Sequence, residues 1–274
     1  MVYPVCWLHV GLFERLSCHM KPIFRRPVAV CLLACLCLIA GTAPVVADHK
    51  SDDEPEPAIF AIPEVWPWGF EDRYGQPDGT LVTFAHRLVA VANLPIAYEL
   101  RPHRRAISEL LEGTVDFVVL FESPLLDKAA IGLGTVVTTQ VMLTAMSDSN
   151  FELSLDGLAG KPVAFISGTY YGEKFEQATS IRKFPVRDIF QAIEMLKLGR
   201  VSAILCSDQA LYRTMQSLQL SPDRFRTRVF REGQRGILYM SRRARYPQLE
   251  GPIREALQQL ERDGDLADIF RLPL

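Results

Sequence analysis

Two carboxylates follow apolar runs that are typical of buried strands. Glu122 comes directly after Val115–Phe121, and Asp208 comes shortly after Val201–Cys206. Glu122 could recognise a cationic ligand at the end of its strand, or it could be a solvated loop residue. Asp208 precedes a helical pattern over Gln209–Leu218, and aspartate is a good N-cap residue for such a helix.

A turn of small polar residues offers hydrogen-bonding groups. Ser167, Gly168 and Thr169 connect the apolar strand Pro162–Ile166 to a helix that begins near residues 172–173. Backbone N–H groups and hydroxyls at such a strand-to-helix turn could hold an anion. The alternative is a structural turn in which glycine supplies the backbone angles.

Aromatic residues near these segments could form the walls of a binding site. The candidates are Trp66, Trp68, Phe70, Tyr170 and Tyr171. Aromatic side chains are more often core than site, so we expect Trp68 and Phe70 in the core. Trp66 and Tyr170 are retained as candidate contacts.

Residue patterns for catalysis and for metal binding are missing from the sequence. His49, His86 and His103 have no metal-binding spacing, and no nucleophile elbow or phosphate-binding P-loop occurs. The formal net charge of −2 gives no sign of nucleic-acid binding. We therefore predict a protein that is not an enzyme, uses no cofactor or metal, and does not bind nucleic acid.

Strand patterns alternate with helical patterns along the chain, which predicts an α/β architecture. The predicted strands are Ala58–Ile62, Ile96–Leu100, Val115–Phe121, Pro162–Ile166, Val201–Cys206 and Arg235–Ser241. The predicted helices are Thr80–Asn93, Arg104–Glu112, Asp188–Leu198, Gln209–Leu218, Leu249–Arg262 and Leu266–Arg271. A helix end, a glycine and a buried strand recur at Gly113 and Gly199, which fits two similar α/β lobes.

The first 47 residues read as an export signal. Basic residues precede the apolar run Val28–Ala40, and small residues end at Ala47, where we predict cleavage. Met20 is an alternative translation start, and an uncleaved anchor or a lipoprotein at Cys35 are alternative readings. Residues 48–57 are polar and acidic, which predicts a flexible lead-in. Cys206 is the one cysteine after the signal, so no internal disulfide is expected.

Several segments resemble one known family in the right order. They are Pro67–Asp72 with the glycines at 75 and 79, Ile107–Asp116, Leu158–Thr169, Leu198–Asp208 and Ile253–Ile269. They are similar to extracellular solute-binding proteins of family 3, the periplasmic receptors of polar amino-acid ABC importers. The resemblance covers nearly all of residues 58–274.

The resemblance implies a two-lobed, periplasmic-binding-protein-like type II fold with a hinge and a ligand cleft. Lobe 1 would be residues 58–143 and 229–274, and lobe 2 would be residues 144–228, with crossings near Val141–Met146 and Arg228–Glu232. It implies a periplasmic monomer that captures a small polar solute, such as an amino acid, for an ABC permease in the inner membrane. The alternatives are an orphan or sensory module of the same fold, or a dehydratase-like enzyme.

The resemblance also implies roles for particular residues. Asp208 would pair with the ammonium group of the ligand, and the turn at residues 167–169 would contact the ligand directly. Ser123 would supply a hydroxyl after the first-lobe strand. The wall that stacks on the ligand would fall on Val65 or Trp66, with Trp68 packed beneath it. The position of the family's carboxylate-binding arginine falls on or beside Lys128, whose ammonium is a point charge and not a fork. Arg104 and Arg105, at the start of a predicted helix, could reach an anionic ligand if Lys128 does not.

Overall fold

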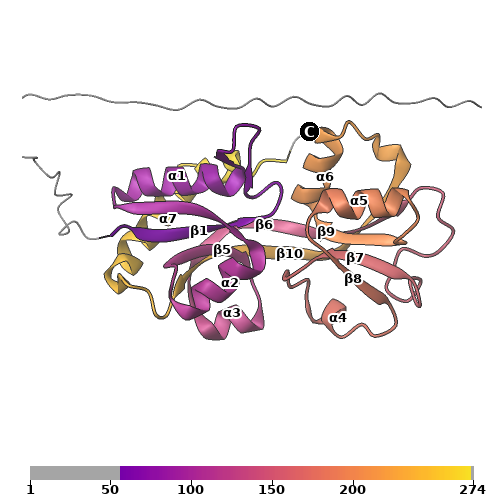
Figure 1. Cartoon of the computed structure of the whole chain (residues 1–274), viewed down its shortest axis with the longest axis horizontal. Coiled ribbons are helices and arrows are strands. Elements are labelled where there is room, and N and C mark those ends of the chain that lie inside the picture. The colour runs from indigo at the N-terminus through magenta and orange to yellow at the C-terminus, as the bar shows by residue number, and fades with distance from the viewer. Residues whose placement is uncertain (1–55, 273–274) are drawn as a thin grey trace, which may run out of the picture. The chain divides into compact units, whose positions relative to one another are not determined.

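The computed structural model describes residues 56–272, which build one eight-stranded sheet with helices on both faces (Figure 1). The predicted signal in residues 1–47 and most of the predicted lead-in lie outside the described residues. Within the described part of the chain, no helix is long and apolar enough to span a membrane.

Three parallel strands form what we call the first half of the sheet. In order across the sheet they are β4 (Ile96–Pro102), β1 (Ala58–Glu64) and β5 (Phe117–Phe121). Helices α1 (Thr80–Ala92) and α7 (Glu250–Arg262) cover one face, and α2 (His103–Glu112) and α3 (Pro124–Ala129) cover the other (Figure 1). Buried apolar residues recur at helical spacing in α1, as the sequence predicted.

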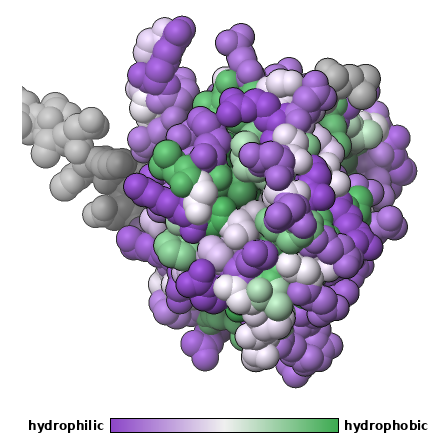
Figure 2. Space-filling model, turned by 90° about the vertical axis from the view of Figure 1, so that its right-hand side faces the viewer, coloured by the Kyte–Doolittle hydropathy of each residue, from purple (hydrophilic) through white to green (hydrophobic). Residues whose placement is uncertain are grey.

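Three more strands form the second half of the sheet. They are β9 (Ala203–Ser207), β7 (Pro162–Ile166) and β8 (Arg182–Val186), again parallel to one another. Its helices are α4 (Glu173–Glu176), α5 (Ile189–Lys197) and α6 (Asp208–Ser217). Hydrophilic residues dominate the outer face of this half, and apolar ones occur there in small separate groups (Figure 2).

Two long antiparallel strands join the halves. They are β6 (Ala130–Met146) and β10 (Phe225–Ser241), each 17 residues long, and they pair with each other over most of their length. In β10, residues 236–240 pair with β5, whereas in β6 residues 141–144 already pair with β9. The segment of the predicted crossing, Val141–Met146, thus already pairs with β9 over residues 141–144.

The remaining elements are short. They are β2 (Phe70–Glu71), β3 (Pro77–Asp78), the 3-10 turns Pro222–Arg224 and Pro247–Leu249, and α8 (Asp265–Ile269). The elements β8 and α3 were not predicted, and β10 was predicted only in two pieces, as the strand Arg235–Ser241 and as the crossing near Arg228–Glu232. The aspartate of the family-like motif, Asp116, is fully buried and accepts hydrogen bonds from the backbone N–H of Ile59 (2.8 Å) and of Arg245 (2.9 Å). Asp116 therefore ties β1 and the segment after β10 to the start of β5.

Candidate functional site

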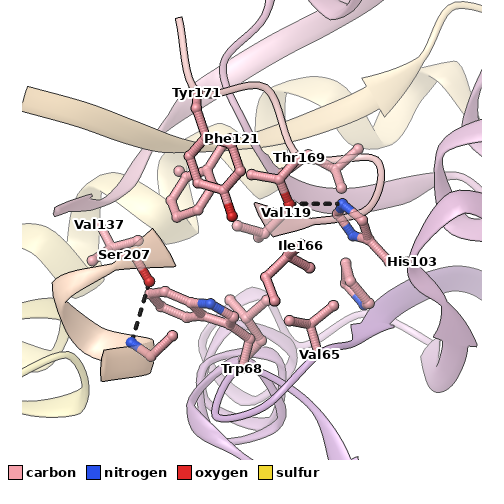
Figure 3. Close-up of a pocket in the computed structure, with 15 residues that line it drawn as sticks. Val65, Trp68, His103, Val119, Phe121, Val137, Ile166, Thr169, Tyr171 and Ser207 are labelled. Carbon is pink, nitrogen blue, oxygen red and sulfur yellow. Dashed lines mark hydrogen bonds between the residues drawn. The ribbon is translucent and has the colours of Figure 1, made fainter. Parts of the chain in front are cut away.

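A cavity of about 50 Å³ lies where strand ends from the two halves of the sheet meet (Figure 3). We call it the central cavity. The first half contributes the apolar side chains of Val65, Trp68, Val119, Phe121 and Val137, and the second half contributes Ile166 and Ala210. Strands β1, β5 and β7 end beside the cavity, which is the edge at which open α/β sheets bind ligands.

Four polar side chains line the central cavity: His103, Thr169, Tyr171 and Ser207. The Oγ1 of Thr169 lies 3.4 Å from Nε2 of His103, so this long hydrogen bond connects the two halves. The Oγ of Ser207 accepts a hydrogen bond from the backbone N–H of Ala210 (3.2 Å). The hydroxyl of Tyr171 points toward the middle of the cavity (Figure 3).

Burial sets the protonation of the imidazole and the phenol. His103 keeps some exposed surface as a residue, but its Nδ1 is shut off from solvent and has no hydrogen-bond partner among the described residues. Burial lowers the pKa of His103 to about 4, so the ring is neutral at pH 7. Burial also raises the pKa of Tyr171, which therefore stays a neutral hydroxyl.

One of the residues predicted from the sequence, Thr169, lines the central cavity. Gly168, Tyr170 and Ser123 line a neighbouring cavity of about 460 Å³, which His103 and Thr169 also border. Ser123 is in addition the N-cap of α3, because its Oγ accepts from the backbone N–H of Leu126 (3.3 Å).

Two further predicted residues lie in a wide outer groove of about 1390 Å³, lined by Ser167 and Trp66 among others. The Trp66 ring packs on Phe70 at 4.5 Å and on Phe190 of α5 at 5.3 Å between ring centroids. Trp66 therefore bridges the two halves beside the central cavity. Trp68 is buried in the core, as predicted, and is also the tryptophan that lines the central cavity.

The Glu122 carboxylate, predicted either to recognise a cationic ligand or to be solvated, forms two ion pairs within the protein. It bonds to Arg231 (3.1 Å) and to Arg235 (2.6 Å) on β10. Only 15% of the Glu122 side chain is exposed. The ion pair raises the pKa of Arg235. Glu122 therefore braces the end of β5 against the strand that connects the halves.

The Asp208 carboxylate also bonds to one of the connecting strands, β6. It accepts hydrogen bonds from the backbone N–H of Gln140 on β6 (3.2 Å) and of Gln209 (2.7 Å), and it lines none of the cavities described above. Burial raises its pKa, and the two backbone donors oppose that shift. The N-cap of α6 is Ser207 and not Asp208, because the helix begins at Asp208, one residue earlier than predicted.

Lys128 lies near the end of α3, exposed and outside the central cavity. The buried residue of that short helix is Leu126. The structure therefore brings no cation to the cavity from α3. Within residues 56–272, no group of three or more His, Cys, Asp or Glu could hold a metal ion.

Sequence reasoning missed three of the four polar residues of the central cavity: His103, Tyr171 and Ser207. A signal was present for two of them. His103 follows β4 directly and Ser207 ends β9, and the carboxyl ends of parallel strands meet at one edge of a sheet. Tyr171 was weighed only as one aromatic among several.

Comparisons with known proteins identify the fold. A scan of protein-family models found no match, and a search of curated proteins found none. Among solved structures, an ancestral arginine-binding protein bound to arginine is 16% identical, with a TM-score of 0.68 over 78% of this chain and 96% of that chain. The ligand-binding core of GluR0 from Nostoc punctiforme, in complex with L-glutamate, is 15% identical, with a TM-score of 0.66 over 78% and 97%.

A third structure, the amino acid ABC transporter substrate-binding protein AbpA from Streptococcus pneumoniae bound to L-arginine, is 14% identical, with a TM-score of 0.65 over 78% and 94%. Identities this low show the fold alone. The architecture agrees with them, because two helix-covered halves are joined by a pair of long strands. The chain has the two-lobed α/β fold of the type II periplasmic binding proteins, as the sequence predicted.

Proposed function

We propose that this protein binds a small solute in the central cavity and closes its two lobes around it. The observation that carries the proposal is the lining of that cavity, which comes from both halves of the sheet. A solute held there would contact Trp68 and Phe121 from one lobe and Ile166 and Thr169 from the other. Hinge closure around a ligand is a known motion of this architecture.

The lobes and the hinge are part of the same proposal. We place lobe 1 in residues 58–137 and 236–274 and lobe 2 in residues 141–228, which moves the predicted boundary in β6 from 143 to the residues before Val141. The hinge would then be residues 138–140 of β6 and 229–235 of β10, where the pairing of these strands shifts register. Glu122 and Asp208 bond to these segments, which supports that placement.

A transport role completes the proposal. The protein would be exported by its N-terminal signal, act in the periplasm as a monomer, and deliver the solute to an ABC permease. Support comes from the sequence resemblance and from neighbours that are named as substrate-binding proteins of amino acid ABC transporters. The second candidate is a sensory or orphan binding module. This candidate is favoured by the neighbour named as the ligand-binding core of GluR0. It is also favoured by the lining of the central cavity, which has no lysine or arginine to pair with the carboxylate of an amino acid.

A thermal-shift screen tests solute binding. The purified protein, as its expression host processes it, would be heated with amino acids, polyamines, sugars, carboxylates and neutral aromatic compounds. A ligand that binds only the folded form adds about 2.7 kcal/mol of stability at a hundred times its dissociation constant. Midpoints that stay unchanged across the whole panel contradict the proposal.

A matched pair of variants tests the location. Ala210→Leu fills the central cavity from α6, whereas Ala90→Leu adds the same atoms to the exposed face of α1. We expect the solute to stabilise the Ala90→Leu protein as it does the wild type and to lose its effect on the Ala210→Leu protein. An equal shift in both variants would place the solute elsewhere.

A further inference from the structure

The central cavity contains no charged side chain. Its lining is apolar except for one imidazole and three hydroxyls, from His103, Thr169, Tyr171 and Ser207. None of its lining residues is an arginine, lysine, aspartate or glutamate. A ligand in this cavity therefore finds hydrogen-bonding partners but no counter-charge.

The two carboxylates that follow the strand ends, Glu122 and Asp208, are committed elsewhere. The Glu122 carboxylate holds Arg231 and Arg235, and the Asp208 carboxylate holds two backbone N–H groups. Turning the Asp208 carboxylate into the cavity would leave the buried backbone N–H of Gln209 without its acceptor, at a cost of about 1–3 kcal/mol. Turning the Glu122 carboxylate would break its ion pairs with two partly exposed arginines.

Zwitterions and ions are disfavoured in such a cavity. The effective penalty for burying one ion is several kcal/mol even after relaxation, and only a paired charge or a full set of hydrogen bonds offsets it. An amino acid carries two such charges. An uncharged apolar molecule instead gains roughly 25 cal/mol for each Å² of apolar surface removed from water.

Polar groups on one side of the cavity could orient a single hydroxyl or carbonyl. The Tyr171 hydroxyl points inward (Figure 3), and Nδ1 of His103 is buried without a partner among the described residues. The 50 Å³ cavity has room for only a few water molecules at roughly 10–15 Å³ each. A ring-sized ligand therefore requires the lobes to separate slightly.

We infer that the solute of this cavity is an uncharged, largely apolar small molecule with one hydroxyl or carbonyl group, and not an amino acid. The inference rests on the proposed function, since it names the chemical class of the solute. Trp68, Phe121 and Val119 would contact its apolar part, and Tyr171 would bond to its polar group.

Calorimetry with matched probes tests whether the central cavity binds uncharged molecules in preference to charged ones. The probes are phenol, toluene, benzoate, L-phenylalanine and L-arginine, each titrated into the purified protein at pH 7.5. We expect phenol and toluene to bind and the three charged probes to bind at least tenfold more weakly. Tighter binding of benzoate or an amino acid, lost in the Ala210→Leu protein, would overturn the inference and leave the proposed function intact. Binding by no probe of either class would count against both the inference and the proposed function.

A pair of tyrosine variants tests the polar contact. Tyr171→Phe removes the hydroxyl from the central cavity, whereas Tyr170→Phe removes one from the neighbouring cavity. We expect Tyr171→Phe to weaken phenol about fivefold and to leave toluene unchanged, as the loss of one neutral hydrogen bond implies. Equal weakening of phenol and toluene binding in Tyr171→Phe would overturn the assignment of Tyr171. The control Tyr170→Phe should change the affinity for neither probe.

A third variant adds the missing charge without removing the helix cap. Ser207→Asp keeps a good N-cap for α6 and places a carboxylate at the cavity wall. We expect it to weaken toluene and phenol at least tenfold. Unchanged affinity for toluene in this variant would contradict a charge-free binding site at this position.

Discussion

The buried imidazole of His103 makes the stability of the protein sensitive to acid. Burial lowers its pKa from the ordinary 6.5 to about 4, so between these values the unfolded chain binds more protons than the folded one. The contribution of the neutral ring is fully present above about pH 6.5 and is lost as the pH falls toward 4. A shift of this size corresponds to about 3 kcal/mol.

Urea unfolding at pH 7 and pH 4 measures this contribution. We expect the wild type to lose about 3 kcal/mol more than His103→Gln over this interval. His86→Gln, on the exposed face of α1, is the matched control and should behave as the wild type. The raised pKa of Asp208 acts in the opposite direction in all three proteins, so it cancels from the comparison. The same pH dependence in His103→Gln and wild type would show that the ring is not shielded.

Residue roles were harder to predict than residue positions. The sequence placed Glu122 and Asp208 at strand ends, which is correct, but the direction of a side chain reverses with each step along a strand. Strand β9 runs one residue further than expected, so Ser207 and not Asp208 lines the cavity. The arginines that hold Glu122 are more than a hundred residues away in the sequence, and no local pattern indicates them.

Among the elements, α2 ends at a glycine that its surroundings require. Gly113 has φ +85°, and an added Cβ would lie 2.6 Å from Cβ and 2.7 Å from the carbonyl oxygen of Arg243. Gly199, at the equivalent place in the sequence pattern, has φ +66° and nothing within 4 Å. We expect Gly199→Ala to cost about 1–2 kcal/mol from backbone strain alone.

Gly113→Ala adds the clash to the same strain, so we expect about 1–3 kcal/mol more. Thermal or urea unfolding of both variants measures the difference. Equal losses would mean that the segment around Arg243 can move away without cost.

The carboxylate of Asp116 should matter for the connection between elements. Asp116→Asn keeps the size of the side chain, but an amide offers one acceptor oxygen where the carboxylate offers two. One of the N–H groups of Ile59 and Arg245 would then face an NH₂ group, and we expect a loss of about 1–3 kcal/mol. Asp148→Asn, at an exposed residue, is the control. Urea unfolding that gives the same free energy for both variants would contradict this account.

Element prediction succeeded where burial produces a simple pattern. The strands β1, β5, β7 and β9 are short apolar runs, and all four were predicted, as was the partly buried strand β4. The first part of β10 carries several arginines and is largely exposed, and β8 contains charges and a proline. Such strands are held by long-range pairing and not by local apolar content, so the sequence alone gave no signal for them.

At the scale of the described fold, contacts on either side of the cavity hold the lobes together. His103 meets Thr169 and Trp66 meets Phe190, each pair joining the first half of the sheet to the second. Gln209 and Arg213 of α6 also donate hydrogen bonds to the carbonyl oxygens of Phe270 (2.5 Å) and Arg271 (2.8 Å). The connection through β6 and β10 is continuous in any state. An equilibrium between closed and open forms that differ by a few kcal/mol is therefore expected.

Gly168 lies beside the contact between His103 and Thr169. A Cβ added there would be 3.0 Å from Cδ2 of His103 and 3.1 Å from Cγ of Arg104, both in the opposite lobe. Gly160 has a similar φ, +71° against +87°, but nothing within 4 Å. Alanine at either position meets similar backbone strain, and only Gly168→Ala pushes against the other lobe.

We therefore expect Gly168→Ala to favour the open form and Gly160→Ala to leave the equilibrium as it is. Small-angle scattering should give a larger radius of gyration for Gly168→Ala. Tryptophan fluorescence should shift to longer wavelength as Trp66 leaves Phe190 and meets water. Because closure and binding are linked, the same variant should also bind a solute of the central cavity more weakly than the Gly160→Ala protein. Identical scattering from the two variants would mean that His103 and Arg104 yield within the closed form, and that the contact at Gly168 does not set the lobe equilibrium.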